Sequence, residues 1–471
     1  MDRRSFLSGS ACAMATLVSH PLLGERVPTP LHIRLDLGQT LGRIPADFTG
    51  LGYEISSVAI PGLLSPANHT YIEMVKTLGQ HGVIRIGGNT SDYASFQPEG
   101  RLVSSPKATV INAESLRQLG RFLDATGWKL IWNLNLGSGT EPQAAQEAQA
   151  VASAVGDKLL AFQIGNEPDL FAHEGHRRSG YGYAQYLQEY RRYKAAIRGR
   201  LAAARFAGPD VAVATDWAVR FAKDEGRDLA LLTHHYYRGG ASNPKSSLRE
   251  LLAPHPNLNK MLDTMRAASR EAGIPYRIVE TNSFSGGGKR GVSNTFGSAL
   301  WTLDYMLTLA SYGAAGLNLE TGMNQLGFIS PYSPIMDDQR GHYTAAPDYY
   351  GMLGFAQLMG GERLVADYDA SGLNASVHAV KRDGCVLITI VNKHTRPAEA
   401  RIDAGDKFHQ GTILRLTAPS LQSETGVTLG SSSVDSTGQW RAAATEPIRY
   451  QRELRLAVPA GSAAFVTLLA E

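Results

Sequence analysis

Two glutamates, Glu167 and Glu280, each follow an apolar segment of the sequence, and a pair of carboxyl groups can carry out acid–base chemistry. The segments before them, residues 158–165 and 276–279, have the composition of strands buried on both faces of a parallel sheet. Pro168 biases Glu167 away from helical angles, which places this carboxylate where a strand gives way to a loop. We therefore expect both glutamates at strand ends, where the catalytic groups of barrel enzymes lie.

Hydrolysis of a glycosidic bond needs two carboxyl groups, one protonated to supply a proton to the leaving oxygen and one ionised. At a separation of about 5 to 5.5 Å the ionised group attacks directly and the anomeric configuration is retained. Like charges at this distance raise the pKa of one group, which supplies the protonated partner. Asn166 could bind a sugar hydroxyl beside Glu167, and Tyr236 could donate a hydrogen bond to Glu280. The alternative for Glu280, a strand-end ion pair, leaves the matching position of Glu167 unexplained.

Six other apolar segments also end at polar residues. They are residues 48–53, 83–86, 130–134, 211–215, 229–233 and 316–319, and the polar residues after them are Glu54, Asn89 (after Gly87-Gly88), Asn135, Asp216, His234 and Glu320. Stripes of apolar residues at helical spacing lie between the strands, and Gly127 and Gly273 fit helix ends. Alternating buried strands and amphipathic helices predict a parallel sheet covered by helices, and eight such units predict a (β/α)8 barrel.

The pattern changes after Gly360-Gly361, where short alternating segments typical of a β-sandwich begin. Residues 31–37 have the same half-buried alternation, so we expect this N-terminal strand to pair with the C-terminal domain. The predicted division is a signal segment at 1–28, the N-terminal strand at 29–45, a catalytic barrel at 46–360 and a β-sandwich at 361–471.

Composition excludes several classes of protein. The 471 residues are 43% hydrophobic and 19% charged, as in a globular enzyme or binding protein, and the net charge of +3 is too small to indicate a nucleic-acid partner. We expect no membrane span, because no apolar stretch reaches about 18 residues.

The N-terminal segment predicts where the protein is located. Arg3-Arg4, followed by Phe6, Leu7 and small apolar residues, predicts a twin-arginine signal and a periplasmic or secreted protein. Without that segment Cys385 is the only cysteine, so no intramolecular disulfide is expected.

No cofactor or metal is expected either. His234-His235 has no third ligand at an obvious spacing for zinc, and Asp337-Asp338 is more typical of a solvated loop than of a calcium site. The glycines before Lys289 lack the spacing of a phosphate-binding loop.

The motifs around both glutamates resemble those of the retaining glycosidases built on (β/α)8 barrels, and within that group the chain resembles glycoside hydrolase family 79, the β-glucuronidases and heparanases. The resemblance covers nearly all of the chain after the signal segment. The matching segments are 50–54, 83–91, 134–137, 164–168, 279–280, 287–289 and 298–301. The resemblance implies that Glu167 is the acid/base, Glu280 the nucleophile and Tyr236 a partner of the nucleophile. It also implies sugar contacts from Glu54, Asn89, Asn135 and Asn166.

The sequence departs from the family's glucuronidases where the sugar carboxylate should bind. Ser285 stands where those enzymes have a tyrosine, and Glu320 where they have a histidine. Glu320 would repel a glucuronate carboxylate unless it is protonated or paired. Lys289 and the backbone of the glycines at 286–288, including Gly287, remain as possible donors to that carboxylate.

The sequence therefore predicts a retaining exo-β-glycosidase whose partner is a carbohydrate, most simply a terminal β-glucuronide. Three alternatives stay open: an endo-acting, heparanase-like hydrolase of glycosaminoglycan fragments, a β-glycosidase for a neutral sugar, and a carbohydrate-binding protein without activity.

Overall fold

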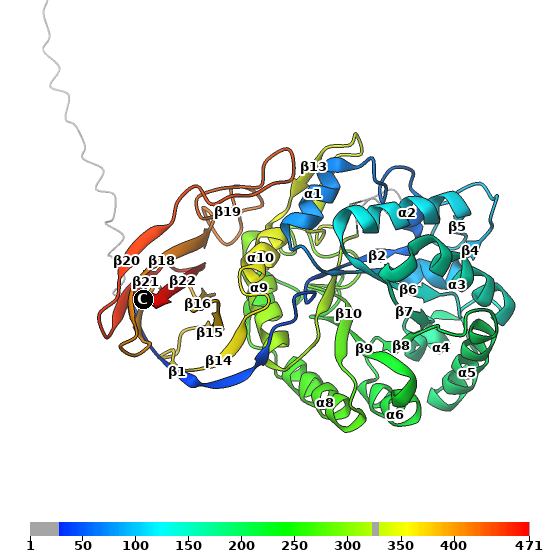
Figure 1. Cartoon of the computed structure of the whole chain (residues 1–471), viewed down its shortest axis with the longest axis horizontal. Helices are drawn as coiled ribbons and strands as arrows, with labels where there is room; N and C mark the ends of the chain where they lie inside the picture. The colour runs from blue at the N-terminus through cyan, green and yellow to red at the C-terminus, as the bar shows by residue number, and fades with distance from the viewer. Residues whose placement is uncertain (1–27, 323–328, 471) are drawn as a thin grey trace, which may run out of the picture.

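Eight parallel strands close into a barrel in the computed structural model, which describes residues 28–322 and 329–470 (Figure 1). Around the barrel the order is β10-β11-β2-β3-β6-β7-β8-β9. The bounds are β2 Gly50–Glu54, β3 Val83–Gly87, β6 Lys129–Leu134, β7 Leu159–Ile164, β8 Phe206–Val211, β9 Leu229–Tyr237, β10 Tyr276–Asn282 and β11 Leu317–Glu320. The predicted barrel is confirmed.

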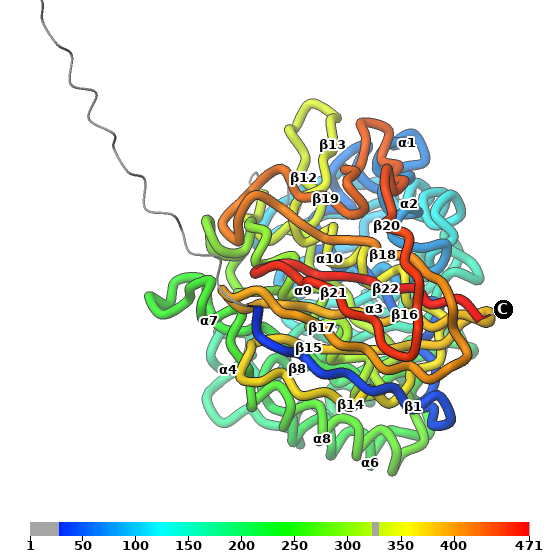
Figure 2. Tube along the Cα trace, turned by 90° about the vertical axis from the view of Figure 1, so that its left-hand side faces the viewer, coloured from blue at the N-terminus to red at the C-terminus, as the bar shows by residue number. Residues whose placement is uncertain are grey.

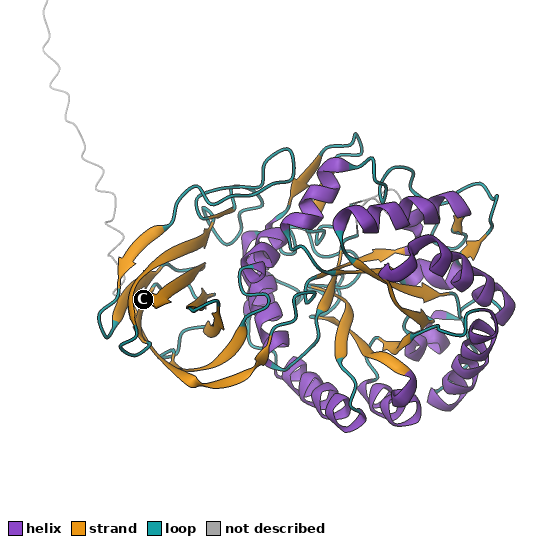
Figure 3. Cartoon of the chain, viewed as in Figure 1, coloured by secondary structure: helices purple, strands orange, loops and turns teal. Residues whose placement is uncertain are grey.

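Helices surround the barrel (Figure 3), and their ends follow local sequence signals. The side chain of Asn112 accepts a hydrogen bond from the Ser115 N–H at 2.9 Å at the start of α2, and Gly127 ends this helix with φ 77°. Gly273 ends α8 in the same left-handed conformation. The longer helices are α1 His69–Thr77, α2 Ala113–Thr126, α3 Glu141–Val155, α5 Tyr183–Arg200, α6 Thr215–Glu225, α8 Pro256–Ala272, α9 Phe296–Ser311 and α10 Pro347–Ala356; α4 Phe171–Glu174 and α7 Leu248–Leu252 are short. Two small two-stranded sheets, β4 Ser95–Phe96 with β5 Val110–Ile111 and β12 Ile335–Asp337 with β13 Tyr343–Ala345, complete the loops.

The fifth barrel strand was predicted wrongly. The sequence indicated residues 211–215 with Asp216 at the strand end, but β8 is Phe206–Val211 and α6 begins at Thr215. The reason is the Gly-Pro-Asp sequence at 208–210, which is typical of a turn. In the structure these residues lie within the strand, and Asp210 has a fully buried side chain inside the barrel.

The C-terminal part of the chain forms one curled ten-stranded sheet, and the N-terminal strand joins it as predicted. β1 Thr29–Arg43 lies between β14 and β17, antiparallel to the first and parallel to the second (Figure 2). The other strands are β14 Glu362–Asp369, β15 Ala375–Arg382, β16 Cys385–Asn392, β17 Ala398–Asp403, β18 Phe408–Thr417, β19 Thr428–Leu429, β20 Glu446–Arg449, β21 Leu454–Val458 and β22 Ser462–Ala470.

Helices α9 and α10 join the barrel to this sheet (Figure 1). A Cβ atom at Gly354 of α10 would lie 2.7 Å from the ring of Phe465 on β22, so the helix and the sheet are in close contact there. Asp304 of α9 accepts hydrogen bonds from Ser376 and Lys393 of the sheet module. One apolar core therefore extends from the barrel into one face of the sheet.

Among the described residues no helix has the length and apolar character needed to cross a bilayer. The twin-arginine segment lies outside the described residues.

Candidate active site

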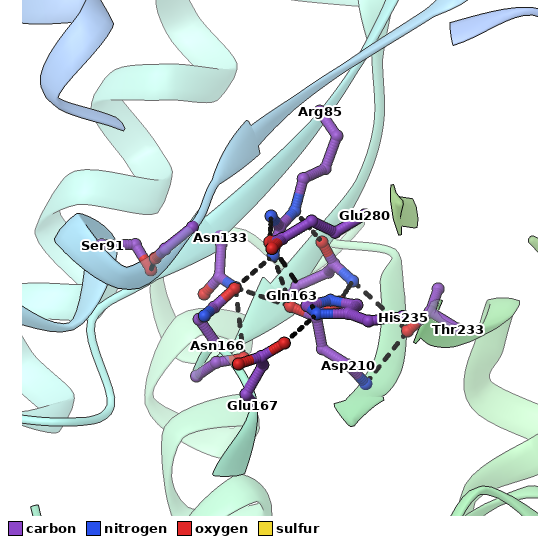
Figure 4. A network of polar contacts seen from close by, with 12 residues as sticks. Arg85, Ser91, Asn133, Gln163, Asn166, Glu167, Asp210, Thr233, His235 and Glu280 are labelled. Carbon is purple, nitrogen blue, oxygen red and sulfur yellow. Dashed lines mark hydrogen bonds and ion pairs between the residues drawn. The ribbon is translucent and has the colours of Figure 1, made fainter. Parts of the chain in front are cut away.

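A cavity of about 790 Å³ opens at the carboxyl ends of the barrel strands, within the size range of small-molecule sites. Glu167 and Glu280 both line it. A network of buried polar groups lies beneath them (Figure 4). The two carboxylates therefore share one solvent-accessible space, and their hydrogen-bond partners determine what each can do.

Glu167 follows β7 in a strained backbone conformation, with φ 52°. Its N–H donates to the carbonyl oxygen of Asp210 at 2.9 Å, and its carboxylate lies 2.9 Å from Nδ1 of His235. Burial raises the pKa of Glu167; the hydrogen bond and charge of His235 oppose this, and the charge of Glu280 adds to it. A raised pKa leaves Glu167 able to hold a proton for delivery.

Glu280, on β10, is held from both sides by donors. The Arg85 guanidinium donates to Oε2 at 2.5 Å, and the Tyr237 hydroxyl donates to Oε1 at 2.9 Å. Hydrogen bonds of this kind stabilise the charged carboxylate. A carboxylate oxygen of Glu280, one of Glu167 and a ring nitrogen of His235 all lie within 4.8 Å of one another.

Arg85, Asp210 and His235 form the charged floor of the site (Figure 4). Arg85 is fully buried and donates to Asp210 at 2.8 Å, and His235 Nε2 lies 2.8 Å from the other oxygen of Asp210. Burial alone would lower the pKa of His235, but the charges of Asp210 and Glu280 and hydrogen bonds to Asp210 and Glu167 raise it to about 10. Burial raises the pKa of Asp210, but the charges of Arg85 and His235 lower it by more. The pKa of Asp210 therefore lies below its usual value. His235 is therefore an imidazolium at neutral pH, and both of its N–H groups donate.

Two asparagines lie beside this floor. Asn166 accepts from Arg85 at 2.7 Å and donates from Nδ2 to Asn89 at 3.1 Å. The Asn166 backbone N–H donates to Asp92 at 3.0 Å, and burial raises the pKa of Asp92 to about 7. These contacts fix the Asn166 side chain next to the acid Glu167.

Two further glutamates, Glu54 and Glu320, line the cavity beyond Glu280. Glu54 accepts hydrogen bonds from the N–H and hydroxyl of Thr90 at 2.7 and 2.6 Å, and burial raises its pKa to about 7. Glu320 is only 3% exposed, and neither of its carboxyl oxygens has a hydrogen-bond partner among the described residues. Burial, with the charges of Glu280 and Glu54, raises the pKa of Glu320 well above its usual range. This part of the cavity is thus rich in carboxyl groups that are easily protonated.

Sequence comparison gives the relatives of the chain. A β-glucuronidase of Aspergillus niger is 29% identical over 384 residues, which cover 74% of this chain and 69% of that protein. A β-glucuronidase of Neurospora crassa is 26% identical over 71% of this chain and 67% of its own, and mouse heparanase is 24% identical over 61% and 56%. The chain is a glycosidase, and these relatives support its resemblance to glycoside hydrolase family 79.

No family model matches the sequence of the chain. Among solved structures, a 4-O-α-L-rhamnosyl-β-D-glucuronidase from Fusarium oxysporum superposes with a TM-score of 0.75 at 20% identity, covering 93% of this chain and all of that one. An α-L-arabinofuranosidase from Thermotoga maritima gives 0.70 at 14% identity, over 93% of this chain and all of its own. At these identities the comparison shows the shared fold.

Tyr237, and not Tyr236, donates to the Glu280 carboxylate. Successive side chains of a strand point to opposite faces, so His235 and Tyr237 of β9 share the face toward the cavity floor. Tyr236 forms a hydrogen bond of 2.6 Å with Nδ1 of His255. The prediction was one residue off because the register of β9 against β10 is not visible in the sequence.

The remaining predicted contacts divide between the cavity and its surroundings. Gly287 lines the cavity together with Glu54, Asn89 and Glu320. Asn135 does not, since its side chain accepts from the N–H groups of Ser138 and Gly139 and donates to the carbonyl of Ala94, which organises the loop after β6. The Lys289 ammonium donates to the carbonyl of Asn243 at 3.2 Å and is also absent from the described cavity lining.

Arg85 and Asp210 are central residues to which the sequence assigned no role. An arginine inside the apolar run at 83–86 was a usable signal, because a buried arginine needs an anionic partner. Asp210 had no such signal, since the Gly-Pro sequence before it hid the strand.

Glu167, His235 and Glu280 are also the described residues whose ligand atoms are close enough together to hold a metal ion. A histidine ligand must be neutral and offer a lone pair. Both nitrogens of His235 are protonated and occupied, and the Arg85 charge is already bound to Glu280. The arrangement fits proton transfer better than cation binding.

Proposed function

We propose that this chain is a retaining exo-β-glycosidase that hydrolyses terminal β-glucuronides, with Glu167 as general acid/base and Glu280 as nucleophile. The observation that carries the proposal is the approach of the two carboxylates, with oxygens within 4.8 Å. Inverting enzymes hold their carboxyl groups about 6.5 to 9.5 Å apart to admit a water molecule, whereas retaining enzymes hold them at about 5 to 5.5 Å.

In the first step, Glu280 attacks the anomeric carbon as protonated Glu167 gives its proton to the departing oxygen. Arg85 and Tyr237 orient the Glu280 carboxylate, and the His235 imidazolium stabilises the Glu167 carboxylate that forms. In the second step, Glu167 takes a proton from water, which attacks the same carbon and releases Glu280. The first step leaves Glu280 as an ester to the sugar and Glu167 as a carboxylate, and the second returns Glu280 as a carboxylate and Glu167 as a carboxylic acid, so the pair is regenerated.

The relatives support a glucuronide as substrate. The Aspergillus niger and Neurospora crassa proteins are named β-glucuronidases, and the Fusarium oxysporum structure is a rhamnosyl-glucuronidase in a Rha-GlcA complex. The heparanase likeness keeps an endo-acting function as an alternative. The chain length of products from heparan sulfate separates exo from endo cleavage.

A neutral sugar is the second candidate, and Glu320 favours it. Among the described residues its buried carboxyl has no hydrogen-bond partner, and those that line the cavity include neither lysine nor arginine. Such a surface suits sugar hydroxyls better than an unpaired glucuronate carboxylate. Protonation of Glu320 would remove this conflict.

A panel of nitrophenyl β-glycosides tests the choice of sugar. We expect the highest kcat/KM for the glucuronide, with the glucoside and xyloside as competitors. A clear preference for the glucoside or xyloside would contradict the glucuronide and establish the neutral-sugar function instead.

We also propose export by the twin-arginine route, on the basis of Arg3-Arg4. Replacement of both arginines by lysine should retain the protein in the cytoplasm, as measured by cell fractionation. Unchanged export of that variant would contradict this route.

A further inference from the structure

The cavity has a second side, which the reaction mechanism does not use. It is formed by the loops after β7 and β8 and by the first turns of α8, and its apolar lining residues are Leu170, Ala212, Val213 and Met261. Leu170 donates its N–H to the carbonyl of Glu167 at 2.8 Å, so this side adjoins the acid. Glu54 and Glu320, on β2 and β11, line the other side of the cavity.

Val213 is unusual because it is an apolar side chain with 72% exposure on a loop that is firmly held. The Asp169 carboxylate accepts hydrogen bonds from the N–H groups of Ala212, Val213 and Ala214, each at 2.9 Å. Asp169 lies two residues after Glu167, so one short segment carries the acid and fixes the loop that presents Val213. A valine that is both exposed and held in place is suited to contact a ligand.

The position of this apolar side relative to Glu167 determines which part of a substrate it can touch. The general acid protonates the oxygen that links the sugar to its aglycone. Side chains that lie next to the acid, on the side away from the sugar, therefore contact the aglycone. The cavity also carries four glutamates and, among its described lining residues, neither lysine nor arginine. Such a surface offers the sulfate groups of a sulfated chain no lysine or arginine with which to pair.

We infer that Leu170, Val213 and Met261 form the binding surface for the aglycone, and that this surface takes a flat apolar group such as an aryl ring rather than a sulfated sugar chain. The inference rests on the proposed role of Glu167 as the acid, and it deepens that function by naming the class of aglycone. It does not depend on which sugar is cleaved.

The test compares 2-naphthyl and phenyl glycosides, whose leaving groups have similar acidity but different apolar area. The substrates carry whichever sugar the parent enzyme prefers in the panel. We expect the parent to favour naphthyl, and Val213→Ser to lower the naphthyl-to-phenyl ratio of kcat/KM by about three- to tenfold, mainly through KM, because apolar contact is lost. Val103→Ser, at another exposed valine outside the cavity, should leave the ratio unchanged.

A ratio in Val213→Ser equal to that of the parent would overturn the inference, as would faster cleavage of a heparan sulfate oligosaccharide than of the naphthyl glycoside. If the glucuronide proposal were wrong, the panel of nitrophenyl glycosides would show another preferred sugar. The naphthyl-to-phenyl ratio could still be measured on glycosides of that sugar, so the two failures are distinguishable.

Discussion

The two sides of the cavity differ in how they can select a substrate. On one side Glu54 and Glu320 present carboxyl groups, and Glu54 is fixed by three hydrogen bonds from Asn89 and Thr90. On the other side Leu170, Val213 and Met261 present apolar atoms. Hydrogen-bonding sites reject an analogue that lacks one polar group far more strongly than apolar sites reject a change of size. The difference indicates strict selection of the sugar and tolerant selection of the aglycone.

The largest effects should come from the glutamates at the border between these sides, and the leaving group should distinguish them. Glu280→Gln should lower kcat by about 10⁴-fold or more for every aglycone, because the nucleophile is lost. Glu167→Gln should cost about 10² to 10⁴-fold for a poor leaving group and much less in the first step for an acidic phenol, which needs no protonation. Stopped-flow bursts of phenol release measure that step.

Glu114→Gln, at an exposed position on α2, is the matched control and should behave like the parent. Near-normal turnover by either Glu167→Gln or Glu280→Gln would refute the assigned pair. If the activities of both variants depended on the leaving group to the same extent, the two glutamates would not differ in role. The distinction between the two sides of the cavity would then be lost.

An intermediate effect is expected at Tyr237, with its neighbour as control. Tyr237→Phe removes a hydrogen bond to the Glu280 carboxylate, a contact worth about 1.5 to 3 kcal/mol, so kcat/KM should fall by about 10- to 100-fold. Tyr236→Phe removes a hydrogen bond to His255 rather than one to Glu280, and it should change kcat/KM by less than about threefold. The reverse order would restore Tyr236 as the partner of the nucleophile.

The smallest expected effect is a change in thermal stability when Glu320 is replaced by glutamine. Because the pKa of Glu320 in the folded protein lies well above the value of 4.5 for a free glutamate, the folded state retains a proton that the unfolded state releases. The parent therefore loses stability as pH rises above that value, and Glu320→Gln does not. We expect Tm of the variant to exceed that of the parent by about 2 to 6 °C at pH 8, with the gain shrinking toward pH 4.

Calorimetry across this pH range gives the result, with the exposed Glu424→Gln as control. A constant difference in Tm between pH 4 and pH 8 would mean that Glu320 keeps an ordinary pKa and is paired, which would weaken the contrast between the two sides of the cavity.

The sequence predicted the barrel and the two glutamates because buried strands and strand-end carboxylates leave local signals. Errors arose where the deciding contact was distant. The one-residue difference between Tyr236 and Tyr237 depends on strand register, and the pairing of Arg85 with Asp210 joins residues 125 positions apart in the chain. At Asn135 the deciding contacts are instead local, because its side-chain amide forms hydrogen bonds within the loop that follows β6. Resemblance to sugar-binding asparagines could not reveal this role.

The place of β1 has a consequence for how this chain can be divided. The first described strand is an inner strand of the sheet, hydrogen-bonded to β14 and β17, which follow the whole barrel in sequence. Its partners are synthesised last, so the sheet cannot close until the barrel has emerged, and its closing contacts span more than 300 residues. A single cut after residue 360 would leave β1 on the barrel without a neighbour and open a gap in the sheet. Expression of the barrel alone would therefore require removal of both ends of the chain and a new polar surface on α9 and α10.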